Sequence, residues 1–115
     1  MIDGNIEKLN ERILIACSRG KRDPAGIKIV AVSKGRNVGD IKSVLSLGMA
    51  DFGESRIQEA LPKFYEIRTT NNEQRIKWHM VGHLQTNKVR DAVRIFDLIH
   101  SVDSLRLAKE IDRQA

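Results

Sequence analysis

Two patterns of hydrophobic residues alternate along the chain: apolar positions at helical spacing, and short continuous apolar runs. The first twenty residues predict an amphipathic helix, whose apolar stripe is Ile6, Leu9, Ile13, Ala16 and Cys17. A break over residues 20–26, which include Pro24, ends this helix. The run that follows, residues 27–33, is rich in β-branched side chains and suits a strand buried on both faces.

The same alternation continues to the end of the chain. We predict three further strands over residues 49–53, 76–82 and 98–101, and a polar loop over residues 69–74. The helices that follow the four strands have apolar stripes at Val38, Ile41, Val44 and Leu47; at Ile57, Ala60, Leu61 and Phe64; at Val89, Ala92, Val93 and Phe96; and at Leu105, Ala108 and Ile111. The predicted order is one helix followed by four strand–helix units.

Polar residues and a proline mark where the predicted helices start or bend. Asn37 is the predicted cap of the second helix, and Thr86 is that of the fourth. Ser55 and Gln58 match the capping-box pattern at the start of the third helix. Pro62 predicts a kink or a late start in that helix, because proline lacks a backbone donor.

This order of elements predicts an α/β fold. Strands that alternate with helices imply parallel pairing and right-handed crossovers. In parallel α/β folds, ligands bind at the carboxyl ends of the strands. We expect those ends to gather on one rim, and they carry Ser33-Lys34, residues 53–55, Gly82-His83 and His100-Ser101.

Lys34 has the most distinctive chemistry on this rim. A lysine that ends an apolar strand is expected to be partly desolvated, which favours the neutral amine. A neutral amine is what Schiff-base formation with an aldehyde or ketone requires. The alternative is a lysine whose charged end extends from the strand into water.

Composition supports one globular domain and excludes several other classes. With 41% hydrophobic and 30% charged residues, the 115-residue chain is neither disordered nor large enough for two domains. The single cysteine excludes a disulfide framework within the chain. We expect a cytoplasmic protein, because the sequence shows neither an apolar run of membrane-spanning length nor a signal-peptide pattern.

Charge and histidine spacing leave other kinds of site less well supported. The net charge of +5 permits an anionic partner. Nucleic-acid binding explains this charge less well than solvated helix faces do, because the basic residues are spread out and one Trp and one Tyr make no stacking pattern. His79 and His83 have a metal-ligand spacing for a helix, but they lie on a predicted strand and its loop. Glu54 and Glu59 are either an acid–base pair or part of a solvated helix face.

Four blocks of sequence resemble one protein family. They are Ala31-Val32-Ser33-Lys34, Asp51-Phe52-Gly53-Glu54, residues 78–88 with the pattern Gly-His-Leu-Gln-x-Asn-Lys, and residues 100–105. In these blocks the chain is similar to the amino-terminal half of the pyridoxal-phosphate homeostasis protein family, which is related to the barrel domain of alanine racemases.

The resemblance implies a TIM-like (β/α)8 barrel with pyridoxal 5'-phosphate joined to Lys34 as an aldimine. Because the family is regarded as carrying or regulating the cofactor without established catalysis, it also implies a protein that is not an enzyme. A racemase-type reaction would need an acid–base partner opposite Lys34, and the sequence supplies no identifiable one. The predicted cofactor-binding residues are Lys34, Arg36, Ser55, His79 and Gly82.

Two of these residues differ from the family pattern, and one has a structural alternative. Ser55 stands where the family usually has an asparagine near the cofactor, and its cap position gives it a sufficient structural role. Arg36 retains the second basic residue after the first strand, although Gly35 loosens that turn. His79 is otherwise a hydrogen-bonded histidine of the core or the rim.

The length departs from the family more than any single residue does. A complete barrel takes about 250 residues, and the stretches with which the family grips the phosphate are missing here. We therefore expect one incomplete barrel domain over residues 1–115: an N-terminal helix over residues 1–22 and four βα units, a half-barrel, over residues 27–115.

A half-barrel has unpaired edge strands and an open inner face. We expect it to self-associate or to need a partner that supplies the missing half. The alternative function is that of a truncated chain or fragment, which keeps the fold elements and binds the cofactor weakly or not at all.

Overall fold

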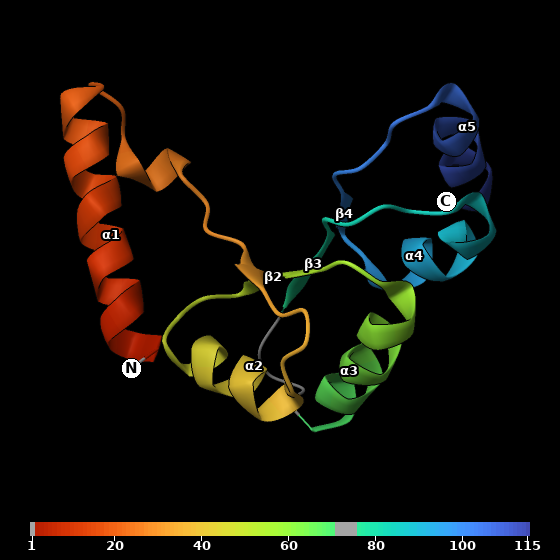
Figure 1. Cartoon of the computed structure of the whole chain (residues 1–115), viewed down its shortest axis with the longest axis horizontal. Coiled ribbons are helices and arrows are strands. Elements are labelled where there is room, and N and C mark those ends of the chain that lie inside the picture. Colours follow the sequence, from red (N-terminus) through yellow and green to blue (C-terminus); the bar gives the residue numbers. More distant parts are fainter. Residues whose placement is uncertain (1, 71–75) are drawn as a thin grey trace.

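The computed structural model describes residues 2–70 and 76–115, which form an α/β fold (Figure 1). Its elements are α1 (Ile2–Arg19), η1 (Pro24–Gly26), β1 (Ala31–Val32), α2 (Val38–Ser46), β2 (Asp51–Glu54), α3 (Ile57–Thr70), β3 (Lys77–Met80), η2 (Thr86–Lys88), α4 (Val89–Ile95), β4 (Leu98–Ile99) and α5 (Leu105–Gln114). The predicted order of one helix and four strand–helix units is confirmed, with η1 and η2 as short 3₁₀ turns. The predicted loop at residues 69–74 lies outside the described residues from residue 71 on, and Thr69 and Thr70 belong to α3.

The four strands form one parallel sheet in the order β1-β2-β3-β4. Phe52 of β2 pairs with Ala31 on one side and with Trp78 on the other. His79 of β3 pairs with Gly53 and with Leu98. Because all four strands run in the same direction, their carboxyl ends lie along one edge of the sheet.

The hydrophobic core lies between one face of this sheet and the helices. The strands contribute Phe52, Trp78 and Met80, which are almost completely buried. The Trp78 ring lies 6.1 Å from that of Phe52 and 6.5 Å from that of Phe64. The helices contribute the buried side chains of Ile41, Leu45, Ile57, Ala60, Ile67, Val89, Ala92, Ile95 and Leu107. This packing fixes the strands relative to α2, α3 and α4.

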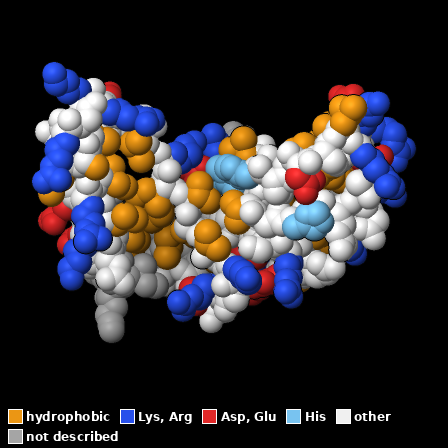
Figure 2. All heavy atoms as spheres, turned by 45° about the horizontal axis from the view of Figure 1, so that its top comes forward, with side chains coloured by type: hydrophobic (Ala, Val, Ile, Leu, Met, Phe, Trp, Pro, Cys, Tyr) orange, Lys and Arg blue, Asp and Glu red, His pale blue; other side chains and the backbone are white. Residues whose placement is uncertain are grey.

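The opposite side of the molecule is hollow, and hydrophobic side chains gather there between α1 and the sheet (Figure 2). The Cα radius of gyration is 15.8 Å, whereas a compact domain of about 100 residues has one of about 13 Å. Val32 is 58% exposed. The prediction of a first strand buried on both faces is therefore wrong, since β1 is a two-residue edge strand with a single neighbour.

Helix α1 stands apart from the sheet in Figure 1, and its main tertiary neighbour is η1. Of its predicted apolar stripe, Cys17 is buried, Ile6 and Ile13 are half-buried, and Leu9 and Ala16 are exposed. The helix therefore forms as predicted, but its apolar face is only partly covered. No helix in the described part of the chain is both long and apolar enough to cross a membrane.

The predicted helix starts are partly confirmed. Asn37 caps α2, since its side chain accepts a hydrogen bond of 2.8 Å from the backbone N–H of Asp40. Thr86 is not the cap of α4, because the chain first makes the tight turn η2. Helix α3 begins two residues after Ser55, one residue later than a Ser55 cap requires, and it runs through Pro62, so a start after the proline is wrong.

Two leucines of α5 provide a test of this packing. Leu107 is 1% exposed, whereas Leu105 is 70% exposed. We expect Leu107→Ala to lower the free energy of unfolding by about 2–5 kcal/mol, because it opens a cavity between α5 and α4. Leu105→Ala should change it by less than about 0.5 kcal/mol. Urea unfolding followed by the fluorescence of Trp78 measures both, and equal losses would contradict the packing described.

Candidate functional site

The carboxyl ends of the strands meet along one edge, as expected for parallel strands. The backbone N–H of Ser33 donates to the Gly53 carbonyl at 2.9 Å, and that of Val81 donates to the Glu54 carbonyl at 3.0 Å. The N–H of His100 donates to the Met80 carbonyl at 2.9 Å. These bonds place the segments that start at Lys34, Ser55, Gly82 and Ser101 in a row along this edge.

Lys34 lies in a tight turn directly after β1. The N–H of Arg36 donates to the Ser33 carbonyl at 3.0 Å and closes the turn. Gly35 has a φ of 72°, a left-handed conformation that glycine adopts without strain. The Lys34 side chain is exposed, so the partial burial expected from its place behind an apolar strand is not found. The strand is too short, and its turn too far out on the sheet edge, to enclose this side chain.

A buried ion-pair cluster lies directly beneath this turn. The Lys63 ammonium donates to the Ser33 carbonyl at 2.8 Å, to Glu54 Oε1 at 3.1 Å and to Glu59 Oε1 at 3.0 Å. The Ser33 hydroxyl donates to Glu54, and the Gly35 N–H donates to Glu59. Lys63 was not predicted as a site residue, and Glu54 is a buried strand residue, not part of a solvated helix face.

The charge state of Glu59 follows from these contacts. The hydrogen bond from the backbone N–H of Gly35, followed by that from Lys63, holds the pKa of the Glu59 carboxyl below its usual value. The charged carboxylate is therefore the form that the turn and α3 stabilise together.

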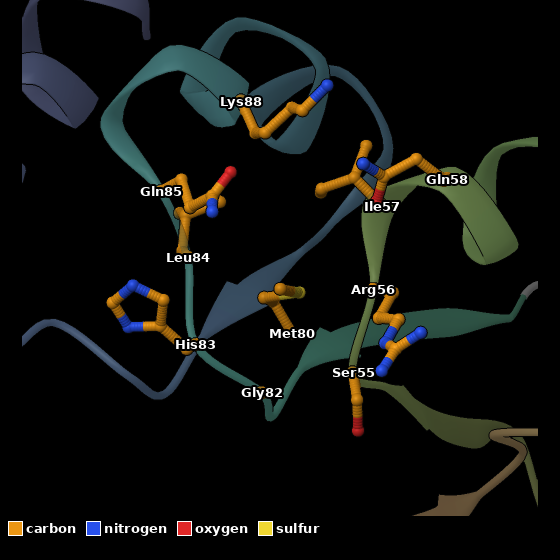
Figure 3. Close-up of a pocket in the computed structure, with 10 residues that line it drawn as sticks. All are labelled: Ser55, Arg56, Ile57, Gln58, Met80, Gly82, His83, Leu84, Gln85 and Lys88. Carbon is orange, nitrogen blue, oxygen red and sulfur yellow. The ribbon is translucent and has the colours of Figure 1, made fainter.

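A pocket of about 630 Å³ opens between the segments that follow β2 and β3 (Figure 3). Its lining residues are Ser55, Arg56, Ile57, Gln58, Met80, Gly82, His83, Leu84, Gln85 and Lys88. Met80 lies between the two segments, and the Ser55 hydroxyl points away from Met80 and Lys88 in this view. Arg56 and Lys88, which are not among the predicted cofactor-binding residues, give the pocket a positive rim.

Gly82 is held against the segment after β2. A Cβ atom at position 82 would lie 2.7 Å from the Ser55 Cα and 2.9 Å from the Ser55 carbonyl carbon. Such contacts are closer than real Cβ atoms make, so only glycine fits here without a backbone shift. The Gly82 carbonyl in turn accepts a hydrogen bond from the Ser101 hydroxyl. The structure thus brings Ser55 and Gly82 together as walls of one pocket.

His79 lies apart from this pocket, in a chain of polar side chains. Its Nε2 lies 2.7 Å from Asp51 Oδ2, and its Nδ1 lies 2.8 Å from Nε2 of His100. The two imidazole rings are stacked with centroids 5.1 Å apart. His79 is buried, while His100 is exposed. Among the described residues no cluster of His, Cys, Asp and Glu could hold a metal ion.

Arg36 lines a separate, smaller cavity of about 150 Å³ between β1 and α2, together with Val32 and Asp40 among others. The five predicted residues therefore fall into four settings. Lys34 is exposed on the edge turn, Ser55 and Gly82 line the pocket, His79 belongs to the polar chain, and Arg36 lies beside α2.

Several curated proteins similar to this chain share one name. The pyridoxal phosphate homeostasis protein of Synechocystis is 48% identical over 92 residues, which are 80% of this chain and 41% of that protein. The protein of the same name from Escherichia coli K12 is 34% identical over 113 residues, 96% of this chain and 47% of that protein. The chain thus spans about half the length of the curated relatives it matches. No family model matches it.

Solved structures agree with these relatives. PipY of Synechococcus elongatus, solved with PLP bound, is 40% identical and has a TM-score of 0.73, with 91% of this chain and 47% of that chain covered. A structure of an unknown protein from Bifidobacterium adolescentis has a TM-score of 0.83 at 28% identity, with 98% and 49% covered. The resemblance predicted from the four sequence blocks is therefore confirmed: over most of its length the chain is similar to pyridoxal phosphate homeostasis proteins, and it matches about half of one.

Proposed function

We propose that this chain binds pyridoxal 5'-phosphate through the amine of Lys34, as an aldimine. The observation that carries the proposal is the place of that amine: although Lys34 lacks the burial expected from the sequence, it is accessible at the carboxyl edge of the sheet, on a turn hydrogen-bonded to α3. Among the described residues no hydrogen bond or ion pair occupies its ammonium group. The similarity to PipY, which was solved with PLP bound, supports the same ligand.

The surrounding residues are suited to the two ends of this cofactor. Pyridoxal phosphate supplies an aldehyde, which reacts with an amine, and a phosphate, which basic side chains and backbone donors hold. Arg36 is an exposed cation two residues after Lys34, and its backbone N–H closes the same turn. Ser55 and Gly82 wall the neighbouring pocket, and His79 supports the sheet beside it through Asp51 and His100.

The proposed role is to carry or regulate the cofactor, not to catalyse a reaction with it. The similar curated proteins are named for pyridoxal phosphate homeostasis. A racemase-type reaction needs a second acid–base group that faces the Lys34 amine, and the described residues offer none in contact with it. A cytoplasmic location stays a prediction from the sequence.

We further propose that the chain is a half-barrel, with residues 1–22 as its N-terminal helix and residues 27–115 as its four βα units. Two edge strands carry exposed apolar side chains, Val32 on β1 and Leu98 on β4. Exposed edges and an open apolar face favour association with another surface. The half-barrel therefore self-associates or takes up a partner that completes the sheet.

Borohydride trapping tests the cofactor proposal. We expect pyridoxal phosphate followed by borohydride to label Lys34 at cofactor concentrations too low to label other exposed lysines, and peptide mass mapping locates the label. Lys34→Arg should abolish it, whereas Lys42→Arg, at an exposed lysine of α2, should leave it intact. Scattered or absent labelling of the original chain would favour the alternative of a truncated chain that lacks a working site.

Gly82→Ala tests whether the close approach of the two pocket walls is needed for stability and for labelling of Lys34. The added methyl group must push the backbone of Ser55 away, so we expect a loss of about 1–3 kcal/mol in the free energy of unfolding and weaker labelling of Lys34. Gly4→Ala is the matched control, because its Cβ meets nothing within 4 Å inside α1; it should be neutral or stabilise by up to about 1 kcal/mol. Urea unfolding and trapping yield measure both effects, and an unaffected Gly82→Ala protein would count against the pocket.

Sedimentation equilibrium over a dilution series tests self-association. The chain has a mass of 13.0 kDa, and we expect a larger mass at high concentration. Val32→Asp should shift the protein towards the monomer because it places a charge on the exposed edge. Tyr65→Asp, at a half-exposed residue of α3, should not. A mass of 13.0 kDa at every concentration contradicts self-association and leaves a partner chain as the remaining form of the proposal.

A further inference from the structure

A second lysine lies directly under the turn that presents Lys34. Lys63 belongs to α3, and its ammonium group is buried with the carboxylate of Glu54. Burying charges is costly unless they are paired and hydrogen-bonded. All of the ammonium contacts in this cluster go to oxygen atoms: the Ser33 carbonyl and the carboxylates of Glu54 and Glu59.

The contacts of this cluster reach both neighbours of Lys34. On one side, Lys63 donates to the Ser33 carbonyl, and the Ser33 hydroxyl donates to Glu54. On the other side, Glu59 accepts from the Gly35 N–H and is itself held by Lys63. The two peptide groups next to Lys34 are therefore fixed to α3, while the Lys34 side chain between them stays exposed.

Stability alone does not account for this arrangement. A buried ion pair can be replaced by apolar residues of similar size without loss of stability in many proteins. Glu59, in contrast, lies at the surface end of the cluster, with its side chain 30% exposed. A partly exposed ion pair contributes less to stability than a buried one, yet the Glu59 carboxylate is the group that accepts the hydrogen bond from the Gly35 N–H. The contacts are directed at the backbone of residues 33 and 35, which sets the direction of the side chain at residue 34.

We infer that Lys63 and Glu59 are positioning residues, which hold the turn so that the Lys34 amine is presented to pyridoxal phosphate. This inference rests on the proposed function. Lys63 and Glu59 act through the backbone and touch neither the amine nor the cofactor. The aldehyde then meets an amine whose approach direction is already set, instead of one that moves with a free turn.

Glu59→Gln in the full chain is the main test, because this side chain is partly exposed and the amide has the same size as the carboxylate. In this variant the Gly35 N–H donates to a neutral amide oxygen in place of a carboxylate. A hydrogen bond to a charged acceptor changes the equilibrium constant for closing the turn by roughly tenfold or more. We expect the trapping yield at Lys34, at limiting pyridoxal phosphate, to fall about tenfold. The urea midpoint should fall by no more than the loss of this one bond, since Lys63 keeps its ion pair with Glu54.

Glu110→Gln is the matched control. Glu110 of α5 also accepts hydrogen bonds from a basic residue, Arg113, at 2.7 Å, but it lies on an element that the turn does not contact. We expect it to leave labelling of Lys34 unchanged. We expect Lys63→Met to remove most of the labelling of Lys34. Lys63→Arg should lose less of it, since arginine keeps the positive charge and the hydrogen-bond donors.

Amide hydrogen exchange of Gly35 supplies a readout that needs no cofactor. The hydrogen bond to Glu59 should slow exchange in the original chain, and Glu59→Gln should speed it about tenfold. Unchanged labelling of Lys34 in a folded Glu59→Gln protein would overturn the positioning role while the proposed function stands. Failure of the original chain to be labelled at Lys34 would overturn the proposed function and this inference together.

Discussion

One-sided burial of the sheet is the constraint on which the rest of the structure depends. Alternate residues of a strand point to opposite faces, and here the face that carries Phe52, Trp78 and Met80 packs against the helices. That packing fixes the register of β2 and β3. The other face is not packed against these helices, and the His79 side chain on it is buried beside Asp51 and His100 instead.

The charged cluster beneath the Lys34 turn follows from the same constraint. Glu54 is the last residue of β2 and lies on the helix-covered face, as Phe52 does. A carboxylate in that position needs a cation from the helix above it, and Lys63 is that cation. The core thus ends in an ion pair at the carboxyl edge, and the backbone directly after β1, at Ser33, is hydrogen-bonded to this pair.

Much of the fold was accessible from the sequence, because it depends on local patterns. The helices, the strands and the parallel α/β class follow from apolar periodicity, and the cap at Asn37 follows from residue type. The burial of Val32 and of Lys34 was predicted wrongly, since burial depends on what covers a face, and no local pattern contains that information. Similarly, the exposure of the apolar face of α1 depends on which other elements pack against it, and the sequence of α1 does not contain that information.

The Lys63 cluster was missed for a different reason. Of its partners, Glu59 lies at the helical spacing of four residues, but Glu54 and Ser33 lie 9 and 30 residues away in sequence, so no spacing rule joins all of them. One signal was present: Lys63 stands three residues after Ala60 and four before Ile67, on the apolar side of its helix. A charged residue in such a stripe indicates a buried partner.

The placement of Ser55 against Gly82 is a contact between two loops, and only the three-dimensional structure reveals it.

The shortness of the two outer strands has a consequence for how the sheet could grow. β1 and β4 each contain two residues, so an incoming strand finds only a few free backbone groups on either edge. Adding a strand beside β1 would therefore require residues 27–30 to extend the ladder at the same time. Growth of the sheet would then need this segment and the incoming strand to pair together, and short edges of this kind also resist indiscriminate stacking into fibres.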